Sequence, residues 1–188
     1  LTPHREVAMP TTISRVLCCL GLKDDCRQVL AHSLSLASTC QAEVHVLHAV
    51  KSLSDDVMQT LKANIRERRT LDALMEQRRA QAAQRLDEFI EALQQDWLGS
   101  HPADSEQSGR QRGDKVSADA PSQMSLITAR AVVEGYPASE IIRYATRHDC
   151  DMIVMATNKR GFSASYAGKV TKGVIKRASV PVVVVPPV

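Results

Sequence analysis

The chain has few aromatic residues and no long apolar run. Phe, Trp and Tyr together make up 3% of its 188 residues, which argues against a surface on which nucleic-acid bases stack. The net charge of +3 is too mild to indicate a nucleic-acid partner. No apolar run reaches the roughly 18 residues of a membrane-spanning helix, and no secretory leader is recognisable. We therefore expect a cytoplasmic protein with neither a nucleic-acid nor a membrane partner.

The cysteines are few and unevenly spaced, and we expect them to be reduced and buried as small apolar side chains. An odd number without paired spacing does not fit a disulfide framework. Adjacent strand residues point to opposite faces, so Cys18 and Cys19 cannot easily share one metal. His45 and His48 lie on one predicted strand, and nothing near them has metal-ligand spacing. No metal site is expected. The five cysteines are Cys18, Cys19, Cys26, Cys40 and Cys150.

The length and composition predict one globular domain. Hydrophobic residues make up 44% and charged residues 24% of the chain, which are ordinary globular values. Residues 1–12 lack periodicity and are expected to form a flexible tail, so the domain spans 13–188. Residues 98–125 contain Gly, Ser, Asp, Pro and Gln and almost no large apolar side chain. Because such a segment cannot bury enough surface to become ordered, we expect a flexible insertion there.

Short apolar runs alternate with segments of helical periodicity. The runs predict strands at 15–20, 43–50, 126–133, 152–155 and 180–185. Pro137 suits the first position of a helix, because its missing N–H would have no intrahelical partner there. Strands joined by helices form a parallel sheet with right-handed crossovers and helices on its faces. The sequence therefore predicts an α/β fold with an open, five-stranded, mainly parallel sheet and helices on both faces.

Residues 54–97 are rich in Arg, Gln, Glu, Ala and Leu, and their apolar positions follow a 3.6-residue period that falters at 66–70. We expect two helices, or one long helix with a break, covering a sheet face. Acidic residues are interspersed along the basic side, which favours a solvated face over a membrane or an acidic partner. A protein partner on these helices remains an alternative. The arginines are Arg66, Arg68, Arg69, Arg78, Arg79 and Arg85.

Ligands of parallel α/β sheets sit outside the carboxyl ends of the strands. The loop 156–168 leaves the strand at 152–155 at that edge and is rich in Gly, Ser, Ala, Lys and Asn. After Asp151 the chain has six basic residues and no Asp or Glu, so this loop forms a positive mouth beside a helix N-terminus. The basic residues are Lys159, Arg160, Lys169, Lys172, Lys176 and Arg177.

Several segments together resemble the universal stress protein family. They are VLCCLGLKDDCRQVLAHSLSLAS, AEVHVLHAV, EGYPASEII and MIVMATNKRG, followed by AGKVTKGVIKRASVPVVVV. The resemblance covers roughly residues 14–50 and 126–186, and it depends on the order and spacing of all the segments. It implies an adenine nucleotide alpha-hydrolase-like, Rossmann-like fold with strand order 3-2-1-4-5. It also implies an intracellular stress-response protein that binds or signals as a homodimer.

The resemblance also points to a nucleotide pocket that departs from the family pattern. An acidic residue ends the first strand in the ATP-binding branch, but Gly21 stands there, so Asp24 or Asp25 would have to reach back. That branch has a Gly-x2-Gly-x9-Gly-(Ser/Thr) loop, of which Gly168 matches the third glycine. Ala156, Lys159 and Lys169 replace the other three, and the spacing to Gly168 is one residue short. The candidate cofactor-binding residues are Leu20, Gly21, Gly135, Met155, Ala156, Lys159, Gly168 and Lys169.

The altered loop leaves two hypotheses for ligand binding. We expect that ordinary ATP binding is lost and that the protein has no cofactor. The alternative is a nucleotide-binding switch in which the basic side chains hold ATP, ADP or AMP. Catalysis has little support, since there is no nucleophile elbow, no phosphate-loop GKS/T and no carboxylate pair beside the pocket. An adenylate-using enzyme is the least supported alternative, and we name no catalytic residue.

The last strand is the expected dimer interface. It is apolar and close to the end of the sequence, and the resemblance implies that it pairs between subunits; an unpaired edge of this kind is otherwise a liability. The alternative is an internal core strand closed off by Pro186. The sequence leaves the particular stress, pathway and partners open. The interface residues are Val182, Val183, Val184 and Val185.

Overall fold

The computed structural model describes residues 12–22, 26–65, 67–99, 123–157 and 168–186. Nearly all of the expected tail, most of the expected insertion, and Lys159 and Arg160 of the basic loop lie outside these residues. Five strands form one sheet in the order β3-β2-β1-β4-β5. Every neighbouring pair is parallel, so the predicted sheet and strand order are confirmed. The strands are β1 (Arg15–Cys19), β2 (Glu43–Lys51), β3 (Ile127–Gly135), β4 (Met152–Ala156) and β5 (Val182–Val185).

Strand β1 lies at the centre of the sheet and is buried on both faces. Leu17 pairs in register with His45 on β2 and with Ile153 on β4. Successive strand residues point to opposite faces, and Cys18 belongs to one core cluster while its neighbour Cys19 belongs to the other. This confirms that the two thiols face apart. Four of the five cysteines are buried as predicted, and Cys40 is half-buried.

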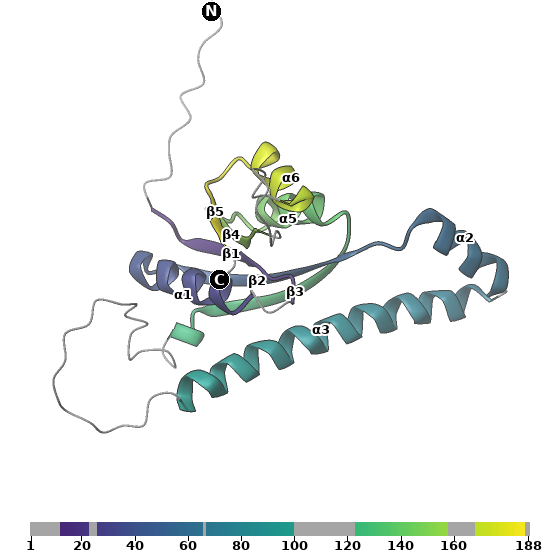
Figure 1. Cartoon of the computed structure of the whole chain (residues 1–188), viewed down its shortest axis with the longest axis horizontal. Helices are drawn as coiled ribbons and strands as arrows, with labels where there is room; N and C mark the ends of the chain where they lie inside the picture. Colours follow the sequence, from purple (N-terminus) through teal and green to yellow (C-terminus); the bar gives the residue numbers. More distant parts are fainter. Residues whose placement is uncertain (1–11, 23–25, 66, 100–122, 158–167, 187–188) are drawn as a thin grey trace, which may run out of the picture.

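Helices cover both faces of the sheet, as predicted (Figure 1). One core lies between the sheet and helices α1 (Cys26–Cys40) and α3 (Arg68–Gly99). The other lies between the sheet and α5 (Pro137–Arg147) and α6 (Lys169–Arg177). Pro137 occupies the first turn of α5, as its missing N–H allows. No helix in the described ranges is both long enough and apolar enough to cross a lipid bilayer.

The segment 54–97 forms two helices, α2 (Asp55–Asn64) and α3, so the predicted break is confirmed. The expectation that the whole segment covers a sheet face is wrong. Helix α2 buries no residue, and the described residues of α3 are buried only from Ala82 onwards. Length explains this, because a 32-residue helix spans about 48 Å, whereas the nine residues of β3 span about 30 Å. The buried residues of α3 are Ala82, Leu86, Ile90 and Leu93.

Helix α2 and the first half of α3 therefore extend beyond the sheet as a helical hairpin (Figure 1). Some of the arginines in this region are paired with acids. Arg78 forms an ion pair with Glu134 at 3.1 Å, and Arg79 forms one with Glu76 at 2.6 Å. These pairs support the interpretation of this basic side as a largely solvated face.

Strand β5 lies at an edge of the sheet, next to β4. The alternative of an internal strand is therefore wrong. The carbonyl oxygens of Pro181 and Val185 accept hydrogen bonds from Ile153 and Thr157, both at 3.0 Å. Because backbone groups alternate along a strand, the N–H and C=O groups of Val182 and Val184 point to the free edge.

Candidate functional site at the carboxyl edge of the sheet

A cavity of about 450 Å³ lies at the carboxyl ends of β1, β2 and β4. Strands β1 and β4 are neighbours although more than a hundred residues separate them in the sequence. From β1, the strands β2 and β3 extend the sheet to one side, and β4 and β5 extend it to the other. Ligands of open α/β sheets bind at the point where the strand order changes direction in this way. The residues that line the cavity are Cys19, Leu20, Gly21, Cys26, Leu47, His48, Ala49, Lys51, Pro137, Ile141, Met155, Ala156, Thr157, Val170 and Thr171.

Four of the residues predicted for the pocket line this cavity. Leu20 and Gly21 follow the end of β1, and Met155 and Ala156 end β4. The structure brings these two distant pairs together because β1 and β4 run side by side, with Cys19 opposite Met155. Among the described residues, a methyl group added at Gly21 would meet only the Sγ atom of Cys26, at 3.9 Å. Glycine is therefore not required there by crowding, and a side chain at position 21 has room.

Three other predicted pocket residues lie outside the lining, and Lys159 lies outside the described residues. Gly135 ends β3, where its carbonyl accepts a hydrogen bond from Ser52 at 3.2 Å, and the side chain of Glu140 packs closely against it. Gly168 precedes α6 and Lys169 begins it, one to two residues before the lining residue Val170. Gly168 has an ordinary φ of −64°, so its backbone does not need a glycine.

The start of α6 is attached to the end of β4. Thr171 is 1% exposed, and its hydroxyl donates a hydrogen bond to the carbonyl oxygen of Ala156 at 3.2 Å. This bond joins the two sides of the loop 156–168 and places the first turn of α6 at the cavity. The first N–H groups of that helix, which have no partner within the helix itself, give the cavity a weakly positive end.

His48 is the best defined polar group in the lining. Its Nδ1 atom lies 2.8 Å from the carbonyl oxygen of Leu20. Since a carbonyl only accepts, Nδ1 must carry the hydrogen, and Nε2 of the neutral ring is then an acceptor. This contact connects β2 to the end of β1 and fixes the imidazole at the cavity wall. Exposed Lys51, at the end of the same strand, adds a positive charge to the lining.

Sequence reasoning missed His48, Lys51, Thr157 and Thr171 as lining residues. The available signal was the parallel sheet itself, because the carboxyl ends of all its strands meet at one edge. Applied to β2, that rule selects His48 and Lys51, which follow a buried apolar run. The buried hydroxyl of Thr171 carried no such signal, because it depends on how α6 docks on the sheet.

Of the two thiols that line the cavity, that of Cys19 is not an activated nucleophile. Burial raises the pKa of the Cys19 thiol well above its ordinary value, and the neighbouring Cys18 and Cys150 raise it further. The thiol therefore remains protonated at neutral pH, whereas the thiolate is the reactive form. No Asp or Glu is among the described residues that line the cavity.

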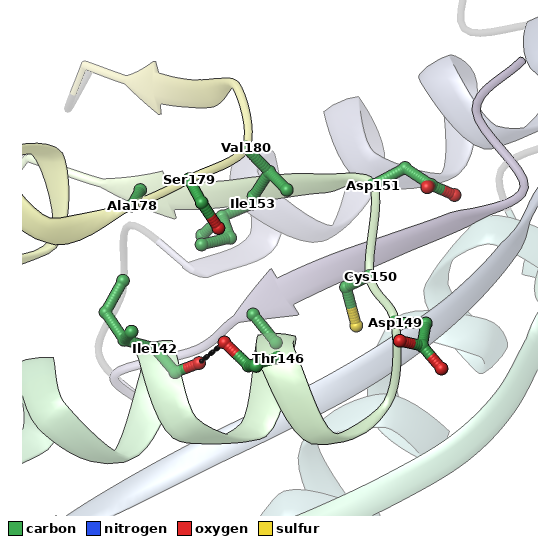
Figure 2. A pocket seen from close by; sticks show the side chains of 10 residues that line it. Ile142, Thr146, Asp149, Cys150, Asp151, Ile153, Ala178, Ser179 and Val180 are labelled. Carbon is green, nitrogen blue, oxygen red and sulfur yellow. Dashed lines mark hydrogen bonds between the residues drawn. The ribbon is translucent and has the colours of Figure 1, made fainter. Parts of the chain in front are cut away.

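A second cavity, of about 280 Å³, lies at the opposite edge of the sheet, before β4 and β5 (Figure 2). Asp151 is engaged there, because its Oδ2 atom accepts hydrogen bonds from the backbone N–H groups of Ser14 at 2.8 Å and Arg15 at 3.0 Å. Burial raises the pKa of Cys150 to about 11, so this thiol is also protonated. The carboxylate of Asp151 joins β4 to β1 and has a structural role.

A buried aromatic cluster lies near that edge, between β2 and α5. The His45 and Tyr144 rings meet edge to face at 6.0 Å, and His148 stacks against Tyr144 at 4.1 Å. The Tyr144 hydroxyl lies 3.3 Å from His45 Nδ1, and Glu43 lies 3.8 Å from His45 Nε2. In the described part of the chain, no group of three or more His, Cys, Asp or Glu side chains has the geometry to hold a metal ion.

An open parallel sheet with helices on both faces, and with a cavity where the strand order changes direction, defines a Rossmann-like α/β protein. The chain belongs to the universal stress protein family, whose family model matches residues 12–186.

Solved structures of this class share the fold across nearly their whole length. The hypothetical protein MJ0577 superposes with a TM-score of 0.60 at 16% identity, covering 94% of this chain and 98% of that one. A universal stress protein solved in complex with cAMP gives a TM-score of 0.53 at 13% identity, with the same coverage. UspA from Lactobacillus plantarum gives a TM-score of 0.54 at 16% identity, covering 93% and 98% of the two chains.

A curated relative matches over a shorter stretch. Universal stress protein MJ0531 from Methanocaldococcus jannaschii is 44% identical over 55 residues. These residues are 29% of this chain and 32% of that protein, so the match spans about a third of the relative's length.

Proposed function

We propose that this universal stress protein binds the adenosine part of an adenine nucleotide in the cavity at the ends of β1 and β4. The observation that carries the proposal is the cavity itself, about 450 Å³ in volume and lined mainly by apolar side chains. Pockets for small ligands usually measure about 300–1,000 Å³ and combine apolar walls with a few placed polar groups. His48 and Thr171 supply such groups. A fold neighbour that was solved with cAMP adds support.

The phosphates are not held as they are in the ATP-binding branch of the family. Ala156 and Lys169 stand at two of the motif positions, so the small residues that let backbone N–H groups approach phosphates are reduced to Gly168. We therefore retain the expectation that ordinary ATP binding through this loop is lost. Adenosine recognition depends on the strand ends and does not require the loop.

The proposed action is binding rather than turnover. The described lining offers no carboxylate, and the pKa of the Cys19 thiol is raised well above its ordinary value by burial. A bound nucleotide would act on the start of α6, which the hydrogen bond between Thr171 and Ala156 already joins to β4. The proposed role in stress is thus that of a sensor that responds to occupancy.

We also propose a homodimer through β5 and an intracellular setting. An apolar edge strand with outward backbone groups at Val182 and Val184 can pair with its copy. Free thiols, four of them buried, suit a reducing compartment. We retain as a proposal the organisation predicted from the sequence, which is one domain over 13–188 with an insertion near 98–125.

A second function, binding a protein partner, is favoured by the hairpin of α2 and α3. Val57 on α2 is 44% exposed, and a hollow of about 480 Å³ between the two helices is lined by Met58, Ile65 and Leu71 among others. Methionine-rich apolar surfaces adapt to partner helices. Such a partner would bind equally with and without nucleotide, because the described residues that line this hollow and the cavity are different.

Equilibrium dialysis of the full chain with adenosine, AMP and ATP at modest salt tests the main proposal. We expect saturable binding of adenosine and AMP at one site per chain. If none of the three is retained at millimolar concentration, the cavity does not bind adenosine and the partner-binding role becomes the better account.

A further inference from the structure

A second hollow borders the proposed adenosine cavity, on the other side of β1 and β2. This hollow has a volume of about 330 Å³ and shares Gly21 and His48 with the larger cavity. Its outer wall is the middle of α3, which contributes Arg78, Gln81 and Arg85. The two arginines are seven residues apart, so two helical turns place them on the same side of α3. A largely apolar cavity and an arginine-lined hollow thus have Gly21 and His48 as common wall residues.

The positive charge of this hollow is only partly neutralised. Arg78 is held in place, because its Nη1 atom lies 3.1 Å from Glu134 Oε1 and its Nη2 atom lies 3.5 Å from the carbonyl oxygen of Lys51. Arg85 forms no ion pair within the described ranges, and its side chain is exposed. None of the described residues that line the hollow is acidic. Among the described residues, Arg78, Arg85 and Lys51 thus outnumber the carboxylate of Glu134.

The backbone at the junction is unusual. Leu22, which also lines the hollow, has a φ of 54°. A large side chain rarely adopts this left-handed conformation, and residues held in it cluster at ligand sites.

We propose that Arg78 and Arg85 form the phosphate subsite of the nucleotide pocket, so that the ligand's phosphates lie towards α3 instead of the loop before α6. The inference rests on the proposed function in that it takes adenosine to occupy the larger cavity. Guanidinium groups bind phosphate oxygens in pairs of parallel hydrogen bonds and keep their charge at every physiological pH. Arg78, oriented by Glu134, positions the group, and Arg85 supplies the unpaired charge.

Gly21 makes this arrangement possible. A carboxylate at this position would lie at the junction of the two hollows and would compete with phosphate for the arginines. Gly21 adds neither a side chain nor a charge to the shared wall of the two hollows. The loss of the acidic residue and the placement of arginines on α3 are therefore two parts of one change in how the ligand is held.

The test is calorimetric titration of the full chain and of its Arg85→Gln variant with three probes: adenosine, tripolyphosphate and ATP. Arg79→Gln is the matched control, because Arg79 lies on the same helix, is paired with Glu76 and does not line the hollow. Lys169→Gln removes a charge at the start of α6. We expect Arg85→Gln to weaken ATP and tripolyphosphate binding about tenfold. We expect adenosine to change less than about twofold and Arg79→Gln to behave as the parent chain.

Two results would overturn the subsite. One is that Arg85→Gln binds tripolyphosphate as the parent does, or that the loss appears in Lys169→Gln instead. The other is that the parent chain binds no tripolyphosphate and holds ATP no more tightly than adenosine. Failure of the proposed function is distinguishable from both, because adenosine would then not bind. Arg85-dependent binding of tripolyphosphate would still support the subsite in that case. Since Arg85 is exposed, its replacement leaves the fold intact.

Discussion

His48 on β2 donates a hydrogen bond from Nδ1 to the carbonyl oxygen of Leu20, 2.8 Å away, at the end of β1. The contact fixes the imidazole where the apolar cavity meets the arginine-lined hollow, since His48 lines both. With Nδ1 occupied, Nε2 of the neutral ring remains as an acceptor for a ligand hydroxyl or amino group. In the proposed function, the strand ends therefore supply contacts to adenosine that the altered loop does not.

Replacing Gly21 by Asp should weaken phosphate binding. A side chain has room at this position, and a carboxylate there would pair with the arginines of α3 and repel phosphate. We expect tripolyphosphate to bind Gly21→Asp about tenfold more weakly than Gly21→Asn, as measured by titration calorimetry. The Asn variant has nearly the same shape without the charge. Equal affinities of the two variants would show that position 21 does not face the bound phosphates.

Lowering the pH should destabilise the fold through His45. The pKa of its imidazole is lowered, first by burial and then by the positive charge of Arg15, while Glu43 opposes the shift. The folded state therefore prefers the neutral ring. Stability is fully present above the ordinary histidine pKa of about 6.5 and falls as the pH drops towards the lowered value, by at most about 1.4 kcal/mol per pH unit.

Urea unfolding of His45→Asn and His32→Asn between pH 7 and pH 5 measures this effect. Arg15, Glu43, Tyr144 and His148 surround His45, whereas His32 is exposed on α1. We expect the pH dependence to flatten in the His45 variant only. A slope that is unchanged in His45→Asn and reduced in His32→Asn would show that His45 is not the group whose protonation destabilises the fold.

Helix α2 and the buried part of α3 should differ in their contribution to stability. Ile90 is fully buried in the second half of α3, so Ile90→Ala should lower the free energy of unfolding by about 2–5 kcal/mol. Leu61 on α2 is only half-buried, so Leu61→Ala should cost less than about 1 kcal/mol. Chemical denaturation measures both. Similar losses would mean that α2 packs more tightly than its burial indicates.

The free edge of β5 should mediate dimerisation. The N–H of Val184 points away from β4, so Val184→Pro removes a donor from the free edge without breaking a hydrogen bond inside the sheet. We expect sedimentation velocity to show a dimer for the parent chain and a folded monomer for this variant. Val184→Thr keeps the donor and should remain dimeric. A dimeric proline variant would place the interface elsewhere.

The sequence predicted the fold well because the relevant signals are local. The run from Val16 to Cys19 and the valines of β5 are short, apolar and flanked by turns, and their alternation with helices determines a parallel sheet. Leu20, Gly21, Met155 and Ala156 could be assigned to one edge because parallel strands all end there. All four line the cavity.

The rest of the site depends on docking, which no local pattern encodes. Arg85 reaches the hollow beside Gly21 only because α3 packs on the sheet from about Arg78 onwards, while its first turns overrun the sheet. The period of α3 is the same in both halves, so periodicity could not separate a solvated arginine from one that lines a hollow. The composition of the loop after β4 likewise carries no information about β2, where His48 and Lys51 lie.

Adenosine binding is the most direct test of the account. Calorimetric titration should give saturable binding at one site per chain for the parent, and none for Gly21→Leu, whose side chain would fill the cavity. The unfolding midpoint of Gly21→Leu should match that of the parent, because among the described residues only Cys26 Sγ lies within 4 Å of the added β-carbon. Equal adenosine affinity in the two chains, or no binding by the parent, would contradict the assignment of this cavity as an adenosine site.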